Sequence, residues 1–199
     1  MEEKKGISAK VWIGIIVIIL VVGCVIGISA NIYYNSPGDV VYDEMDGGEV
    51  SLRYTDDKNL FSIVDFTPLS DVSGMALESA DRFFDFIVAT DISYANSISY
   101  NVVVVKNGDL SNVPNEYIKL YLEEEKSGSF VSVVEPTVFS PNVKDGTYDG
   151  EAMTIFQMNK KKSGKDNYRL RMWISEEAQL TAEQINNFTI NIEVEGEAN

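Results

Sequence analysis

The chain has 199 residues, with 16 Lys and Arg against 31 Asp and Glu, and a formal net charge of −15 at pH 7. This charge repels phosphate backbones and argues against a nucleic-acid partner. The sequence holds no histidine and a single cysteine. That composition excludes Ser–His and Cys–His catalytic pairs, internal disulfides and thiolate metal clusters. We therefore predict a protein that is not an enzyme, uses no cofactor and is stabilised by packing alone.

The first thirty residues predict a membrane segment. Residues 1–10 form a basic stub, and residues 11–30 carry no charge. At ~1.5 Å per residue this run spans about 30 Å, the hydrocarbon thickness of a bilayer. Lysines precede the run, and the next basic residue is Arg53, so the positive-inside bias places residues 1–10 in the cytoplasm and the acidic remainder outside. The residues that mark this anchor are Val11, Trp12, Leu20, Cys24 and Ala30.

Three fates of this segment are open, and a retained transmembrane helix is favoured. A lipobox ending at Cys24 would leave a lipidated chain, but the sequence stays apolar after the cysteine. Cleavage after Ala30 would start the mature chain at Asn31, but the apolar run is long for a removed signal. Gly23 and Gly27 form a G-x-x-x-G pair suited to close packing against a partner helix.

Turn-forming and alternating segments follow in chain order. Residues 31–48 are rich in Gly, Pro, Asp and Asn and predict a linker or stalk. Residues 49–199 are the predicted extracellular domain. Alternation of apolar and polar residues predicts strands within 48–55, 59–69, 82–91, 97–106, 116–125, 129–139, 152–159, 168–175 and 187–196. Residues 70–81 and 142–151 are predicted loops, and Pro136 is expected to interrupt its strand.

The alternation also predicts which side chains face the core. The inward positions are Val50, Leu52, Tyr54, Phe84, Phe86, Val88, Phe188, Ile190, Ile192 and Val194. The basic turn at 160–166 joins two strands as a predicted hairpin, and a capping box at 181–184 predicts a short helical turn. Strands at short intervals without amphipathic helices between them predict an all-β fold, an antiparallel β-sandwich.

Five stretches in this order resemble one family. They are "LSDVSGM", "FFDFIVATD", "YNVVVVKNGD", "YIKLYLEEE" and "YRLRMWISEEAQ". The pattern resembles the TasA/camelysin group of Gram-positive surface proteins. The resemblance implies a jelly-roll-like sandwich displayed on the cell surface, and some members are released by a signal peptidase and form fibres by strand donation. Protease activity described for camelysin-type members is not carried over, because the chain has no H-E-x-x-H motif.

Three groups of residues are candidate sites. Lys160, Lys161, Lys162 and Lys165 form a dense basic cluster that suits either a solvated turn or a contact to anionic wall polymer. Another group offers either a glycan-binding strip or a core tryptophan with arginines facing water: Tyr168, Arg169, Arg171 and Trp173. Two acidic stretches lack EF-hand spacing and are interpreted as turns, so no metal site is predicted: Asp39, Asp43, Glu44 and Asp46, and Asp145, Asp149 and Glu151.

Together these features predict a membrane-anchored surface protein that serves adhesion, matrix or envelope assembly. Its expected partners are membrane lipid, wall polymer, other surface proteins or further copies of itself. One alternative is a released fibre subunit joined by strand exchange. Another is an accessory subunit of a membrane complex, in contact with its partner through the glycine pair.

Overall fold

The computed structural model describes residues 40–55, 61–63, 67–79, 82–108, 111–144, 146–179 and 188–199. All of them belong to the unit Gly38–Asn199. The predicted anchor, with its Gly23 and Gly27 pair, and the capping box at 181–184 lie outside these ranges. Within the ranges, no helix combines the length and apolar character that crossing a bilayer requires.

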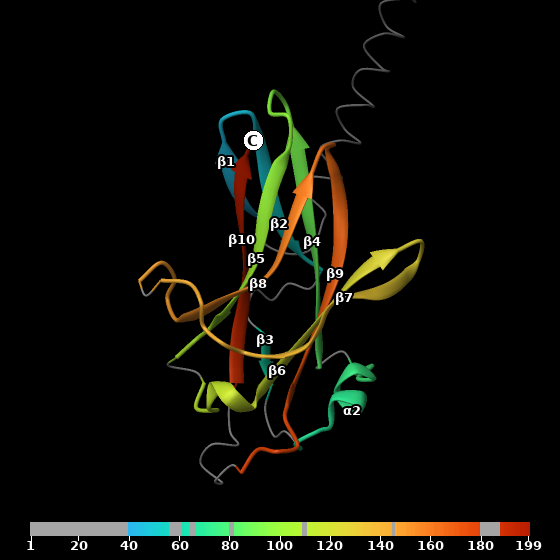
Figure 1. Ribbon diagram of the computed structural model, residues 1–199, viewed down its shortest axis with the longest axis vertical. Helices are drawn as coiled ribbons and strands as arrows, with labels where there is room; N and C mark the ends of the chain where they lie inside the picture. The colour runs from blue at the N-terminus through green and yellow to red at the C-terminus, as the bar shows by residue number, and fades with distance from the viewer. Residues whose placement is uncertain are drawn as a thin grey trace, which may run out of the picture. The chain divides into compact units, whose positions relative to one another are not determined.

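Two antiparallel sheets make up the domain (Figure 1). The six-stranded sheet has the order β1 (Val40–Met45), β2 (Gly48–Tyr54), β4 (Phe83–Ile92), β9 (Gly164–Ile174), β6 (Ile118–Lys126) and β7 (Ser129–Val138). The four-stranded sheet has the order β3 (Phe61–Ile63), β10 (Phe188–Ala198), β5 (Ile98–Lys106) and β8 (Glu151–Lys160). Helix α2 (Asp71–Met75) and the 3-10 turn η1 (Asn115–Tyr117) complete the elements of the described ranges. The predicted all-β, antiparallel class is confirmed.

The main apolar core of the described residues lies between the sheets and receives side chains from both, and a smaller cluster of Val103, Val105 and Ala152 is separate from it. All ten predicted inward positions are buried, from Val50 in β2 to Val194 in β10. Because successive side chains of a strand point to opposite faces, alternation in the sequence is enough to sort them. Aromatic rings from neighbouring strands stack within this core, as Phe86 and Tyr168 do at 5.4 Å between centroids.

The linker predicted for residues 31–48 is wrong from Val40 onward. Strand β1 pairs with β2 from Val40 opposite Arg53 to Met45 opposite Gly48. Gly47 closes the turn between them at φ 99°, a conformation that glycine adopts without steric cost. The Asp-Gly dipeptide here is a strong hairpin signal, and the turn-rich composition around it concealed that signal.

The hairpin predicted for the two strands around residues 160–166 is also wrong. Strand β8 pairs with β5 in the four-stranded sheet, whereas β9 lies between β4 and β6 in the six-stranded sheet. Both edges of β9 are therefore occupied, and the basic turn carries the chain from one sheet to the other. Most connections do the same: β1–β2 and β6–β7 are the sequential strand pairs that stay within one sheet.

Strand β7 runs through Pro136, where the sequence predicted an interruption. Its pairing with β6 shifts register between Leu120 and Leu122, next to this proline. In the described part of the chain β7 pairs on one side only, and a proline is tolerated at such an edge position beside a register irregularity.

Candidate functional site

Three turns and the C-terminus meet at one end of the sandwich, the upper end in Figure 1, and hydrogen bonds tie them together. The Gly47 carbonyl accepts from the amides of Ser93, Tyr94 and Ala95 at 3.0, 3.0 and 3.1 Å. The Ile92 amide donates to Ser163 Oγ at 2.9 Å, which fixes the β8–β9 turn beside the β4–β5 turn. The Asn96 amide donates to the Asn199 carbonyl at 2.8 Å. We call this end, which carries Lys161, Lys162 and Lys165, the lysine end.

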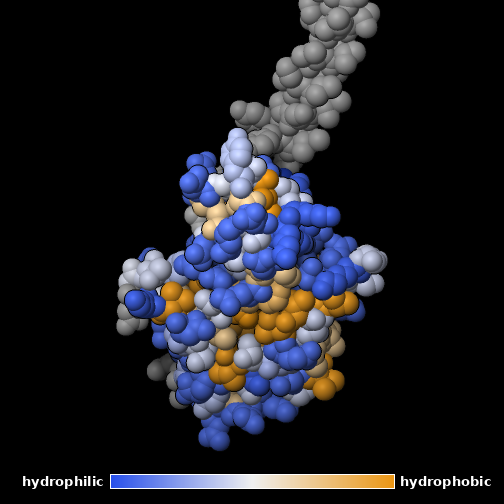
Figure 2. All heavy atoms as spheres, turned by 45° about the horizontal axis from the view of Figure 1, so that its top comes forward, coloured by the Kyte–Doolittle hydropathy of each residue, from blue (hydrophilic) through white to orange (hydrophobic). Residues whose placement is uncertain are grey.

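The lysine end presents one fully exposed aromatic ring and several cations. Tyr94 is 94% exposed, and the side chains of Lys161, Lys162 and Lys165 are also exposed. Asp91 lies among them and accepts from Ser163 Oγ at 3.2 Å. Figure 2, which brings this end forward, shows mostly hydrophilic side chains over it and apolar side chains farther down. The surface can therefore make ionic and stacking contacts with a flexible anionic or polyhydroxylated ligand.

Lys160 is not one of the lysines available for ionic contacts with a ligand. Its Nζ donates to Asp166 Oδ1 at 2.7 Å, and Asp166 is 9% exposed because it faces inward from β9. The predicted basic cluster is thus divided: Lys161, Lys162 and Lys165 face solvent, whereas Lys160 neutralises a buried carboxylate. A buried charge is tolerated when a partner compensates it in this way.

Two buried tyrosines extend the interior network around Asp166. Tyr100 Oη donates to Asp166 Oδ2 at 3.0 Å and lies 2.6 Å from Tyr168 Oη. Burial raises the pKa of Tyr100 far above its ordinary range, and the neighbouring Tyr168 and Asp166 raise it further. Burial likewise raises the pKa of Tyr168. Both phenols stay neutral and act as structural hydrogen-bonding groups beneath the lysine end.

A shallow polar depression of about 840 Å³ lies on the outer face of the four-stranded sheet. Its lining side chains include Asn101 of β5, Gln157 and Asn159 of β8 and Glu195 of β10. Gln157 Nε2 donates to Asn101 Oδ1 at 2.9 Å, and Asn159 Nδ2 donates to Ser99 Oγ at 2.9 Å. Because these amides bond to each other or to the Ser99 hydroxyl, part of the hydrogen-bonding capacity that a ligand would use is already satisfied.

The predicted aromatic and cationic strip on β9 is not accessible. Trp173 is 3% exposed and so is buried as the core alternative predicted, but it lies against Gly74 of α2 on the outer face of the sheet and not between the two sheets. The expectation that both arginines face water is wrong. Arg171 is 8% exposed, forms an ion pair with Glu123 and donates from Nε to the Leu77 carbonyl at 2.8 Å. Burial lowers the pKa of Arg171. The segment after α2 therefore covers this row, which a strand pattern alone does not reveal.

Arg169 is held at the uncovered end of the same row. Its guanidinium donates from Nε and Nη2 to the two carboxylate oxygens of Asp85 at 2.7 Å each. The guanidinium carbon lies 3.8 Å from the ring centroid of Phe83 and 4.3 Å from that of Phe130. This double stacking and bidentate pairing engage the whole planar group, so Arg169 stabilises the sheet and is not free for a ligand.

Among the described residues, the acidic candidates for calcium ligands form no metal-holding group. In the described part of the chain, no group of three or more His, Cys, Asp or Glu side chains is placed to hold a metal ion. Asp39 and Asp145 lie outside the described residues. Glu151 contacts Asn115 and Lys106 instead. Sequence reasoning missed this contact and also Tyr94, because nothing local distinguishes an exposed turn tyrosine from a packed one.

The fold and this end together define the class of the molecule, an acidic antiparallel β-sandwich with a cationic cluster of turns at one end. Comparisons with protein-family models, curated proteins and solved structures find no match to the chain.

Proposed function

We propose that this chain is a non-enzymatic, membrane-anchored surface protein that serves adhesion, matrix or envelope assembly. In this proposal the acidic sandwich lies outside the membrane, and the lysine end contacts an anionic wall polymer. The observation that carries the proposal is the exposure of Tyr94, at 94%, beside the exposed lysines of the β8–β9 turn. A tyrosine left fully in water beside cations suits a contact surface, because its ring can stack while its hydroxyl group forms a hydrogen bond.

Two further features support this proposal. The uncharged run at residues 11–30, with lysines before it and an acidic chain after it, suits a retained anchor with an external domain. Repeated crossing between the sheets supports a jelly-roll-like arrangement, as the resemblance to the TasA/camelysin group implies. The overall charge of −15 repels anionic polymer at most approaches, so a local cationic end would also orient the encounter.

Binding to poly(glycerol phosphate), a simple anionic wall polymer, tests the lysine end. In Lys162→Glu, we expect the affinity of the detergent-solubilised full chain to fall about five- to tenfold, since one surface charge pair contributes up to about 1 kcal/mol and reversal adds repulsion. Lys144→Glu is the matched control, because Lys144 is an exposed lysine in the loop before β8. Equal losses in both variants would show that net charge alone matters and would refute the assignment.

Location is tested separately from binding. On intact cells, a membrane-impermeant amine reagent should label Lys161 and Lys162, identified by peptide mass spectrometry. Labelling that appears only after the cells are broken would place the domain inside and refute the anchored, external arrangement. This experiment does not depend on which polymer the lysine end contacts.

A second candidate function is a released fibre subunit joined by strand exchange. One observation favours it: β7 and β8, outermost strands of their sheets in the described part of the chain, border a depression of about 600 Å³. Its apolar lining includes Val133, Val134, Ile155 and Phe156. Such an edge can accept an added strand. Salt-resistant polymers whose chains begin at Asn31 would support this function, whereas full-length chains confined to membranes would refute it.

A further inference from the structure

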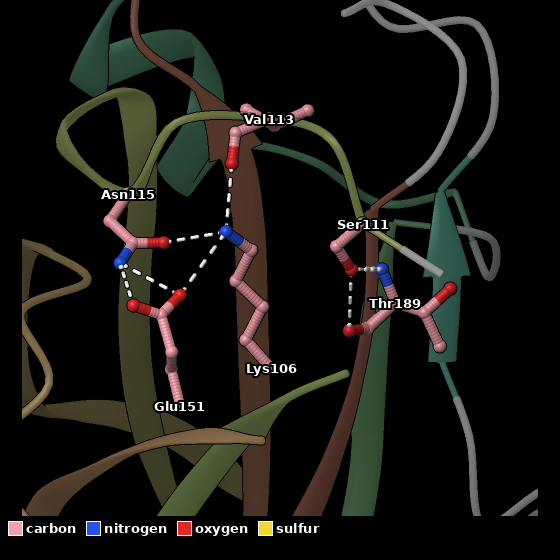
Figure 3. Close-up of polar contacts among 6 residues, drawn as sticks. All are labelled: Lys106, Ser111, Val113, Asn115, Glu151 and Thr189. Carbon is pink, nitrogen blue, oxygen red and sulfur yellow. Dashed lines mark hydrogen bonds and ion pairs between the residues drawn. The ribbon is translucent and has the colours of Figure 1, made fainter. Parts of the chain in front are cut away.

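A lysine, an asparagine and a glutamate meet where β5 ends (Figure 3). Lys106 is the last residue of β5, Asn115 the first of η1 and Glu151 the first of β8, directly opposite Lys106 in the β5–β8 register. Lys106 Nζ lies 2.6 Å from Asn115 Oδ1 and 3.5 Å from Glu151 Oε2. Asn115 Nδ2 donates to both oxygens of Glu151 at 3.0 Å. An amine, a primary amide and a carboxyl group are therefore in mutual contact.

The backbone of β5 directs the lysine into this contact. Lys106 continues the inward row that contains Tyr100, Val102 and Val104, and its side chain is 8% exposed. A lysine at such a position requires polar partners. The carbonyl of Val113, a residue 1% exposed, accepts from Nζ at 2.9 Å. The amine is thus fixed from several sides and is itself buried, whereas the Glu151 side chain beside it is 50% exposed.

The asparagine side of the contact is fixed as well. Ser111 Oγ donates to the Thr189 carbonyl at 3.1 Å and accepts from the Thr189 amide at 2.8 Å, which pins the segment before η1 to β10 (Figure 3). Val113 packs in the core two residues before Asn115. Holding two reacting groups in contact in this way replaces a bimolecular encounter and lowers the barrier to their reaction.

We infer that Lys106 and Asn115 join in an intramolecular amide cross-link, with Glu151 as the proton carrier. The Lys106 ammonium passes a proton to Glu151, and the resulting amine attacks Asn115 Cγ. Glu151 then returns that proton to the departing amide nitrogen, which it already contacts. The Nζ–Cγ bond forms, the Cγ–Nδ2 bond breaks and ammonia leaves with the second ammonium proton as ammonium ion. No oxidant or metal is required, and the charge balances.

The cross-link would connect the two sheets. Lys106 belongs to the four-stranded sheet, whereas η1 leads directly into β6 of the six-stranded sheet. A chain with one cysteine has no internal disulfide to constrain its unfolded state. A covalent bond between residues 106 and 115 would constrain that state as a disulfide does. This modification is independent of the proposed function and of the fate of the N-terminal segment.

Trypsin digestion of the full chain followed by mass spectrometry tests the inference. Without a cross-link, cleavage after Arg82, Lys106 and Lys119 yields separate peptides 83–106 and 107–119. With it, one species covers 83–119, resists cleavage after Lys106 and is lighter by one ammonia, with fragments that join Lys106 to Asn115. Separate peptides of full mass from the wild-type chain would overturn the inference, and so would simple deamidation of Asn115.

Two variants assign the roles. Lys106→Arg keeps the positive charge but should abolish the lighter species, and Glu151→Gln should abolish it while far-UV circular dichroism stays unchanged. Full cross-linking in Glu151→Gln would overturn the role of Glu151 as proton carrier. Lys160 provides a control within the same digest. Its Nζ contacts the Asp166 carboxylate, but the third group at this contact is the Tyr100 phenol, whereas Glu151 supplies a second carboxyl group at the contact of Lys106. Lys160 should remain unmodified in every sample.

Discussion

Replacing Gly74 by alanine should detach helix α2 from the outer face of the six-stranded sheet. Gly74 lies against the indole of Trp173, and an added Cβ would be 2.1 Å from Cδ2 and 2.3 Å from Cε2 of that ring. Ordinary carbon contacts are ~3.5 to 4.0 Å. The ring or the helix must therefore retreat by more than an ångström, although Trp173 is 3% exposed and has little room to move.

The backbone around α2 restricts that retreat. The Leu69 amide donates to the Ile174 carbonyl at 2.8 Å, and the Leu77 carbonyl accepts from Arg171 at 2.8 Å. Overpacking in such a site costs about 1–3 kcal/mol. Complete loss of the tryptophan contact would approach the ~3–5 kcal/mol of a Trp→Ala change, which sets an upper limit. We expect a loss of about 2 kcal/mol, or about 4–8 °C in Tm for a domain of this size.

Urea unfolding of the full chain, followed by far-UV circular dichroism, measures this loss. Gly164→Ala is the matched control, because a Cβ at Gly164 meets nothing within 4 Å; its stability should change by less than about 1 kcal/mol. In a Trp173→Leu background, Gly74→Ala should cost less than about 0.5 kcal/mol, since the clash is gone. Equal effects of Gly74→Ala and Gly164→Ala, or the full cost in the leucine background, would refute the contact.

Two further predictions concern buried ionisable groups. Burial raises the pKa of Tyr100 and Tyr168, so above about pH 10 the unfolded chain loses these protons while the folded chain keeps them, and the free energy of unfolding falls by up to about 2.7 kcal/mol per pH unit. That stability is fully present below about pH 10. Urea unfolding between pH 9 and 11, on the order of one unit either side of the normal pKa, measures how steeply the free energy of unfolding falls with pH. In Tyr100→Phe, this slope should be about half that of the wild-type chain. Glu123→Ala should cost about 3–5 kcal/mol in the same assay at neutral pH, because it leaves the Arg171 charge buried without its partner. Asp71→Ala, at a more exposed ion pair, should cost less than about 1 kcal/mol, and similar losses in the two variants would contradict this ranking.

Local pattern was sufficient for the core and for most strands, although it missed β1. Alternation at Val50, Leu52 and Tyr54, and again from Phe188 to Val194, predicted buried faces that the structure confirms. Side-chain direction in a strand depends only on position along that strand, so no knowledge of partners is needed. Composition acted in the same way: the absence of histidine excludes whole classes of catalytic site whatever the fold.

Pairing and coverage were decided by the tertiary structure. The β8 and β9 patterns suit a hairpin equally well, but β9 has β4 and β6 on its two edges and β8 pairs with β5. Arg171 alternates like a solvent-facing residue and is buried because the chain after α2 lies over it. Hydrogen-bonding edges and covering segments come from distant parts of the chain, and a local pattern does not encode them.

The contact of Lys106, Asn115 and Glu151 depends both on local sequence pattern and on tertiary structure. The sequence determined that a lysine ends the apolar run at 102–105, and the fold places that lysine on the inward face of β5, where it needs polar partners. Which partners it meets was decided only when β8 aligned Glu151 opposite it and the buried Val113 placed Asn115 beside its amine. Inward direction follows from the two-residue period of one strand, whereas chemical neighbours follow from register and loop packing between strands.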